Sequence, residues 1–310
     1  MKTAKWFPHL LLLMILALPT AAAGDITVLF PPDLTLARDG KMKIFAFRPV
    51  GGPASVTVNG EIKDPLKGNS LQSGQVDLNP GVNLLNVGGK RIRVYLDPKA
   101  GGDRVRVLPE GEESAIEFQA YRLHPALDDG CEGCHSVDGM KLKVKEQKEA
   151  CYACHDNFEK DEGKKKYVHS PVAAGECTGC HDPHFAVRPK LQKLEKGCLE
   201  CHDPQPETAS VHLPVKERQC TGCHSPHASV VPRQLVRGGN DLCLGCHGKL
   251  HSHHPFGPGG KRQVVVRVPP DIPRNSAEFA CQACHLPHQA PERRLLRKDQ
   301  GELCRTCHPV

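Results

Sequence analysis

The chain has 310 residues, with 41 basic and 35 acidic side chains and a formal net charge of +6. This length allows about two domains. Beyond residue 23 no apolar stretch reaches the roughly 20 residues that a membrane-spanning helix requires, which excludes a polytopic membrane protein.

The first 23 residues have the layout of a secretory signal peptide. Lys2 and Lys5 precede an apolar stretch at 10–18, and three alanines follow at 21–23. Because the apolar stretch is too short to span a bilayer, we expect cleavage just after Ala23. The mature protein is therefore predicted to be periplasmic, with secretion or attachment to the outer surface as the alternative.

Residues 24–120 have the pattern of a β domain. They contain neither cysteine nor histidine, and short stretches of alternating polarity recur about every 10–15 residues between turn signals such as Asn59-Gly60 and Pro80-Gly81. The predicted strands are Ile26–Phe30, Met42–Phe47, Ala54–Val58, Gly74–Leu78, Val82–Val87, Arg91–Leu96, Arg104–Leu108 and Ala115–Tyr121. This spacing predicts a β-sandwich.

Two phrases within this region, VTVNGE at 56–61 and VDLNPGVNLLNV at 76–87, resemble bacterial immunoglobulin-like modules. Residues 24–120 contain no recognisable metal cluster, nucleophile or phosphate loop. The region is therefore expected to dock a partner or to shield one end of the rest of the protein, and not to catalyse a reaction.

Residues 121–310 contain all 16 cysteines, and every one belongs to one of eight C-x-x-C-H motifs. A zinc ribbon also uses paired C-x-x-C, but it does not require a histidine after each second cysteine. C-x-x-C-H is the attachment sequence of c-type haem, in which the two thiols add across the vinyl groups and the histidine reaches the iron. We therefore predict eight covalently bound haem c groups.

The predicted attachment and proximal sites follow directly from the motifs. The covalent sites are Cys131, Cys134, Cys151, Cys154, Cys177, Cys180, Cys198, Cys201, Cys220, Cys223, Cys243, Cys246, Cys281, Cys284, Cys304 and Cys307. The proximal iron ligands are His135, His155, His181, His202, His224, His247, His285 and His308. With roughly 24 residues for each haem, the polypeptide is too short for an ordinary apolar core. We expect a haem-packed domain at 121–310 that is mostly coil with short helices, for example over Leu142–Cys154 and Glu278–Cys284.

Histidines outside the motifs are candidates for the distal face of each iron. In CTGCHDPH, at 177–184, His181 and His184 lie three apart and project from the same side of a helix or turn. They cannot clamp one iron from opposite faces, so His184 is expected to serve a neighbouring haem. The predicted distal ligands are His124, His169, His184, His212, His227, His254, His288 and His251.

These histidines form part of an internal repeat. Each repeat consists of H-(x)-P, then C-x-x-C-H-x-P-H, then a second C-x-x-C-H, and the four pairs begin at Cys131, Cys177, Cys220 and Cys281. The first pair departs from the pattern, because SVDGM follows CEGCH. The missing ligand is open between His251, His253, the thioether of Met140 and an iron with a vacant face.

The doubled arrangement CTGCHDPH…CLECH resembles the repeats of bacterial multihaem c-type cytochromes over residues 121–310. The resemblance implies an electron carrier, not an enzyme, in anaerobic or extracellular respiration. Its partners would be a quinol-oxidising cytochrome upstream and an outer-membrane or extracellular acceptor downstream. Two alternatives stay open: a reductase of a small nitrogen or sulfur oxyanion at one open haem, and a subunit of a polymeric cytochrome filament.

Charge does not favour a nucleic-acid partner. Each haem would bring two propionates, and these would offset the formal positive charge of residues 121–310. The run Lys164–Lys166 is expected to be a solvated loop. The more specific alternative is a docking patch for an acidic redox partner.

Overall fold

The structure is a computed structural model, and it describes residues 25–136, 141–203, 208–248, 274–275, 278–279 and 281–307. The predicted signal peptide, Met140, the cluster at 251–254 and His308 lie outside these residues, as do the side chains of Cys304 and Cys307. The chain divides into two compact units. The first, here called the β unit, runs to Tyr121 and includes Asp129–Lys141. The second, the motif unit, combines Arg122–Asp128 with the chain from Leu142 onward.

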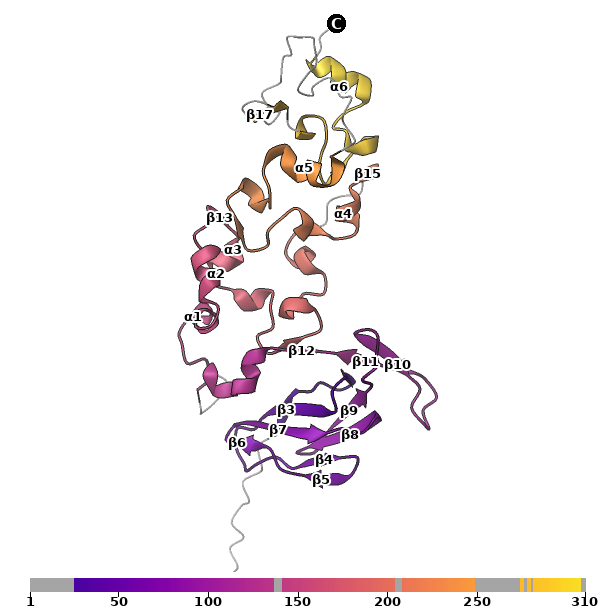
Figure 1. Cartoon of the computed structure of the whole chain (residues 1–310), viewed down its shortest axis with the longest axis vertical. Coiled ribbons are helices and arrows are strands. Elements are labelled where there is room, and N and C mark those ends of the chain that lie inside the picture. Colours follow the sequence, from indigo (N-terminus) through magenta and orange to yellow (C-terminus); the bar gives the residue numbers. More distant parts are fainter. Residues whose placement is uncertain are drawn as a thin grey trace, which may run out of the picture. The chain divides into compact units, whose positions relative to one another are not determined.

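The β unit is built from two sheets (Figure 1). The four-stranded sheet has the order β1 (Thr27–Phe30), β3 (Lys41–Phe47), β7 (Leu71–Asp77) and β6 (Lys67–Gly68). The seven-stranded sheet has the order β10 (Arg104–Val107), β11 (Ile116–Ala120), β2 (Thr35–Ala37), β9 (Lys90–Leu96), β8 (Gly81–Val87), β4 (Val56–Val58) and β5 (Glu61–Lys63). The pairs are antiparallel except that β2 runs parallel to both β9 and β11.

All eight predicted strands are present with small shifts at their ends, while the short strands β2, β5 and β6 were not predicted. Strands of two or three residues leave little alternation for a sequence pattern to register, and β4, of three residues, was predicted because it lies in the longer alternating stretch Ala54–Val58. The β-rich character of this unit is therefore confirmed, and the resemblance to immunoglobulin-like modules stays a prediction.

The β unit has a side-chain core of its own. Alternate residues of β8 and β9 are buried, so each strand turns one face inward. Asn83 lies fully buried among them, and its amide is satisfied by the backbone of Asn79 and by Asn59. Such complete pairing is what a buried polar group requires.

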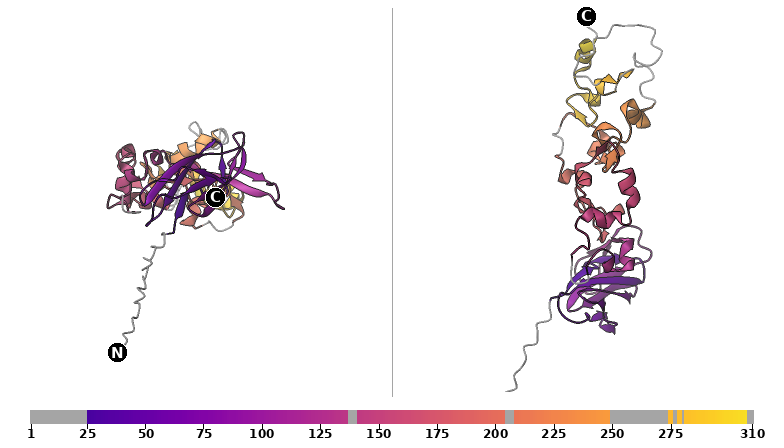
Figure 2. Two further views of the ribbon diagram at one scale, coloured as in Figure 1. Left: turned by 90° about the horizontal axis from the view of Figure 1, so that it is seen from below. Right: turned by 90° about the vertical axis from the view of Figure 1, so that its left-hand side faces the viewer.

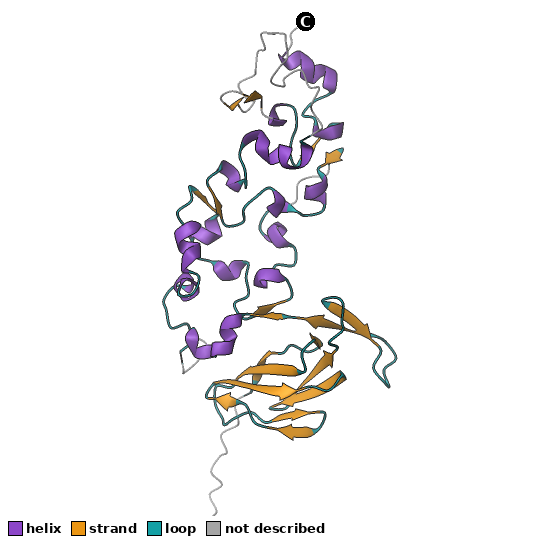
Figure 3. Cartoon of the chain, viewed as in Figure 1, coloured by secondary structure: helices purple, strands orange, loops and turns teal. Residues whose placement is uncertain are grey.

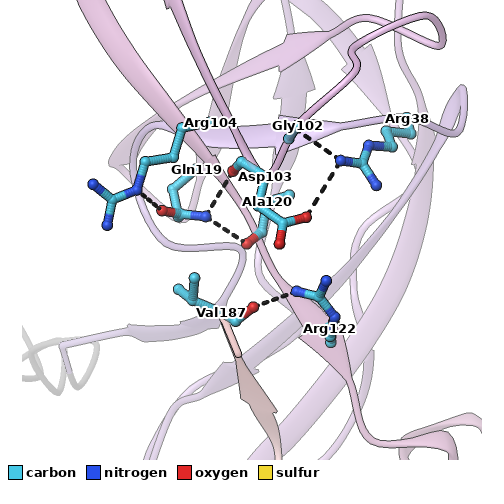
Figure 4. A network of polar contacts seen from close by, with 8 residues as sticks. All are labelled: Arg38, Gly102, Asp103, Arg104, Gln119, Ala120, Arg122 and Val187. Carbon is cyan, nitrogen blue, oxygen red and sulfur yellow. Dashed lines mark hydrogen bonds and ion pairs between the residues drawn. The ribbon is translucent and has the colours of Figure 1, made fainter. Parts of the chain in front are cut away.

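Polar contacts fix the end of the β unit next to Tyr121 (Figure 4). The Gln119 amide donates to the carbonyls of Asp103 and Ala120 at 2.7 and 3.0 Å and accepts from Arg104 at 2.7 Å. Strand β11 is thereby tied to the chain leading into β10.

The motif unit has a different construction, with short helices joined by irregular chain (Figures 2 and 3). Its strands form two-residue antiparallel ladders: β12 (Arg122–Leu123) with β14 (Phe185–Ala186), β13 (Tyr167–Val168) with β16 (Ala228–Ser229), β15 (Ser210–Val211) with β19 (Gln289–Ala290), and β17 (Arg274–Asn275) with β18 (Glu278–Phe279).

Helices of the chain carry or flank the C-x-x-C-H motifs. The α-helices are α1 (Gln147–Tyr152), α2 (Asp156–Asp161), α3 (Ser170–Ala173), α4 (Leu213–Lys216), α5 (Gly239–His247) and α6 (Gln300–Cys307). The 3-10 turns are η1 (Pro125–Asp129), η2 (Cys131–Gly133), η3 (Cys177–Gly179), η4 (Pro189–Leu191), η5 (Gly197–Glu200), η6 (Cys220–Gly222), η7 (Pro232–Gln234), η8 (Cys281–Ala283) and η9 (Arg293–Leu295). No helix in the described part of the chain is long and apolar enough to cross a bilayer.

Of the two helices predicted within this region, one is present over part of its range and the other is absent. Over Leu142–Cys154 the helix forms only at Gln147–Tyr152, where Glu146 and Glu149 form a capping box. The prediction of a helix over Glu278–Cys284 was wrong, since a strand at Glu278–Phe279 and a 3-10 turn at Cys281–Ala283 occupy that stretch.

The motif unit has almost no apolar core among its described residues. Its buried hydrophobic side chains are four alanines: Ala186, Ala228, Ala283 and Ala290. Four methyl groups cannot offset the entropy of ordering this much chain. Another apolar body is needed to fill the unit, and covalently attached porphyrin would provide it.

Candidate functional site

The C-x-x-C-H motifs share one backbone turn. In six of them the histidine N–H donates to the carbonyl of the first cysteine at 2.9–3.1 Å, and the second cysteine N–H reaches the same carbonyl at 3.2–3.3 Å. In the motif at 243–247 the same residues continue helix α5. The described cysteines from 131 to 284 are not joined in disulfides, so disulfide formation does not compete with haem attachment in these seven motifs.

Five motif histidines each lie opposite a histidine from outside the motifs. The ring centres are 5.9–6.1 Å apart in every case: His124 with His155, His169 with His202, His181 with His227, His212 with His247, and His224 with His288. Each pair thus combines a predicted proximal with a predicted distal ligand.

This separation suits one metal ion between two imidazoles. An imidazole nitrogen binds a first-row metal at about 2 Å and lies about 1 Å from its ring centre, so rings on opposite sides of one ion have centres about 6 Å apart. Among the described residues no group of three or more histidine, cysteine or carboxylate side chains converges as a zinc site would. The residues present fit haem iron with two axial histidines.

The two-residue ladders place the distal histidines. Just beyond β12 and β14 the N–H of His124 donates to the carbonyl of His184 at 2.8 Å. The same bond joins His169 to His227 beside β13 and β16 at 2.8 Å, and His212 to His288 beside β15 and β19 at 2.9 Å. Each ladder therefore sets side by side the H-(x)-P histidine of one pair and the x-P-H histidine of the next.

The His224–His227 segment shows what the second histidine of H-x-P-H does. His224 faces His288, whereas His227 faces His181. Two histidines three residues apart thus belong to different ring pairs, and this segment links two adjacent metal positions.

Backbone carbonyls hold several of these imidazoles through Nδ1. The distal rings of His169 and His212 contact the carbonyls of Pro226 and Pro287 at 3.0 and 2.9 Å. When Nδ1 carries the proton and donates to a carbonyl, the Nε2 lone pair is left for a metal. The proline of H-x-P-H therefore contributes a carbonyl that the sequence pattern alone did not single out.

In the second, third and fourth pairs the proximal ring of the first motif contacts a different carbonyl. The Nδ1 atoms of His181, His224 and His285 contact the carbonyls of Lys190, Arg233 and Arg294 at 2.8, 3.0 and 2.9 Å. These basic residues lie nine positions after each histidine, a recurrence that the internal repeat could have revealed.

Burial favours the neutral form of three distal imidazoles. The pKa values of His124, His227 and His288 are lowered from the ordinary value, first by burial and then by the neighbouring histidines. A neutral imidazole offers the lone pair that metal ligation needs.

Thiols of successive pairs also lie together. Burial raises the pKa of Cys243 to about 11, with a further contribution from Cys281. Burial likewise raises the pKa of Cys198, which is hydrogen-bonded to Cys220. The second motif of one pair is therefore adjacent to the first motif of the next.

Other predicted residues have different surroundings. The first motif, with Cys131, belongs to the β unit, where Lys67, Gly68 and Leu71 of the β6–β7 edge and Glu132 help to line a cavity of about 170 Å³. His184 is described, but the iron that it would serve stays a prediction.

The described residues do not include several predicted ligands, namely His251, His253, His254, His308 and Met140. In the run Lys164–Lys166, Lys165 is paired with Glu162 and Lys166 lies over the Tyr167 ring.

Comparison with known families identifies the repeats. Three segments, at 169–207, 212–252 and 273–310, match the doubled CXXCH motif family. No curated protein matches the chain. The doubled CXXCH motifs, with their paired imidazoles, indicate a multihaem c-type cytochrome with covalently bound haem.

Proposed function

We propose that this protein is an exported octahaem cytochrome that carries electrons along a chain of closely spaced haems, most of them with two axial histidines. The observation that carries the proposal is the set of five imidazole pairs with centres 5.9–6.1 Å apart. When bound, haem supplies a one-electron iron couple. The five imidazole pairs would each hold one iron between two histidines, and an iron held in this way would exchange electrons without binding a substrate.

The pairing follows a rule within the repeat. The second motif of a pair faces the H-(x)-P histidine that precedes the same pair, as His169 faces His202. The first motif of a pair faces the x-P-H histidine of the following pair, as His181 faces His227. Every pair is thereby linked to the next, and the links fix the distances between irons.

The rule accounts for the irregular first repeat. An x-P-H histidine serves the preceding pair, and residues 1–130 contain no C-x-x-C-H motif that it could serve. The absence of such a histidine after CEGCH therefore leaves neither iron of the first pair short of a proposed ligand. This favours a carrier over a reductase with a vacant face at the first repeat.

Within residues 121–310 no x-P-H histidine follows His288, so we propose that His251 or His253 serves the iron of His285. By the pairing rule His254, the H-P histidine ahead of that pair, would face His308. A histidine from a second copy would instead produce the filament that the sequence leaves open.

We further propose a periplasmic location, with the outer surface as the alternative, and redox proteins as partners on the quinol side and the acceptor side. The β unit, with the proposed immunoglobulin-like fold, would shield the first haem or dock a partner. Its edge strand β6 already contributes to the cavity beside Cys131.

The test is a haem count followed by electron paramagnetic resonance of the oxidised protein, repeated after reduction and exposure to carbon monoxide. We expect eight haems per chain, all low-spin and unreactive with carbon monoxide. Fewer than eight covalent haems would contradict the octahaem proposal. A high-spin haem that binds carbon monoxide in the unmodified protein would favour the reductase.

A further inference from the structure

The turns that hold the proximal histidines have an unfavourable backbone. At Lys190, Arg233 and Arg294 the φ and ψ angles are 56° and 27°, 58° and 23°, and 59° and 26°. The next residues, Leu191, Gln234 and Leu295, also have φ between 55° and 60°. Two consecutive left-handed residues form a type I′ turn, which favours asparagine and glycine.

None of the three turns contains asparagine or glycine at these positions. Each has a long basic residue first, as in PKLQ, PRQL and RRLL at 189–192, 232–235 and 293–296. A residue held in a strained backbone conformation at a site is evidence for a role there. The carbonyl contact alone does not explain the choice, because any residue supplies a carbonyl.

The cations of these residues are available. All three residues are exposed, and no acid or carbonyl among the described residues takes their side chains. Two other basic residues nearby are occupied: Arg188 donates to the carbonyl of Glu195 and Arg297 to that of Gln282. The three turn cations share their position in the repeat, and no hydrogen bond or ion pair within the described part of the chain engages their side chains.

Each turn also lies at the metal position that it serves. The carbonyl of Lys190 contacts Nδ1 of His181 at 2.8 Å, and the ring of His181 lies opposite that of His227. A haem bound there would present carboxylates at its edge, and a lysine or arginine at that edge suits them.

We propose that Lys190, Arg233 and Arg294 each bind a propionate of the haem whose proximal histidine their own turn holds. This inference rests on the proposed function, since it requires haem at these motifs. Pairing a propionate with a cation removes negative charge from near the iron, which makes the iron easier to reduce. The haems of His181, His224 and His285 are therefore raised in reduction potential by their turns.

The test uses Lys190→Asn, Arg233→Asn and Arg294→Asn, singly and combined, in the haem-loaded protein. Asparagine accepts the left-handed conformation and keeps the carbonyl on the histidine, so only the cation is lost. Potentiometric titration followed by electron paramagnetic resonance should show one haem per substitution with a lower potential. We expect about a tenfold change in its reduction equilibrium, or about 59 mV for a one-electron couple. The combined variant should lower the reduction potentials of three haems.

Two matched variants distinguish the effect of the cation on the reduction potential from the effect of the left-handed backbone. Lys190→Arg keeps a cation and should leave the potential unchanged. Leu191→Gly relieves the second left-handed residue, keeps the cation, and should raise resistance to unfolding without moving any potential. Eight low-spin haems with unchanged potentials in the combined variant would overturn the propionate proposal alone. A haem count below eight in the unmodified protein would instead overturn the proposed function.

Discussion

Replacing His227 by alanine should open one iron, and that iron should be the one held by His181. The structure places the two rings 6.1 Å apart, centre to centre. The substitution leaves the attachment residues Cys177, Cys180 and His181 in place, so the haem should stay bound. It also preserves the backbone bond from His169 to residue 227, at 2.8 Å, because that bond uses the carbonyl. The ladder of β13 and β16 should therefore survive the change.

The expected magnitude follows from the motif count. With eight motifs in the chain, one opened iron makes about one eighth of the haem reactive with carbon monoxide. The assay is a carbon monoxide titration of the reduced variant by optical spectroscopy. Electron paramagnetic resonance of the oxidised variant should detect one high-spin centre. His288→Ala should give the same result at the iron of His224, and the double variant should bind two equivalents.

Phe158→Leu provides a control, because the Phe158 ring touches His227 edge-on at 4.8 Å between centres without belonging to a pair. It should bind no carbon monoxide. If His227→Ala binds none either, while its haem count stays at eight, His227 is not an axial ligand and the pairing rule fails.

Three further predictions concern packing and charge. Gly74→Ala should destabilise the β unit by about 1–3 kcal/mol, because its methyl carbon would lie 2.7 Å from Leu66, whereas Gly101→Ala meets nothing within 4 Å; equal chemical denaturation curves would contradict this. Gln147→Ala should cost about 1–2 kcal/mol in thermal unfolding of the haem-loaded protein and speed amide exchange at Thr178, because it removes two hydrogen bonds of 2.6 and 2.9 Å. Burial raises the pKa of Asp33, but its bonds to Arg93 lower it further, so the net pKa lies below the ordinary value. The stabilisation is therefore present above the ordinary pKa of aspartate and is lost as pH falls through the lowered one. Asp33→Asn should cost less than about 1 kcal/mol at pH about 7, since both side chains are partly exposed, and progressively less as the pH falls through the lowered pKa; a difference that does not shrink in acid would refute the assignment.

The sequence by itself determined the chemistry of the attachment sites. A c-type haem is attached through residues within five consecutive positions, so C-x-x-C-H contains all that the covalent step needs. Eight strands of the β unit could be predicted as well, because each lies in a stretch of five to seven residues with alternating polarity, which is a local signal. Histidines three apart, such as His224 and His227, could likewise be assigned to different irons from their spacing.

The sequence did not determine which distal histidine faces which proximal one. The rings of His224 and His288 meet across a long stretch of intervening chain, and the ladder that brings them to the site, β15 with β19, is only two residues long on each side. Pairings of that length leave no periodic pattern, because they depend on backbone hydrogen bonds between distant segments. The same limit hid the carbonyls of Pro226 and Lys190, whose role lies in where the backbone points and not in the side chain. The tertiary structure alone decided the order in which the metal positions are linked, because distal ligation joins segments that only folding brings together.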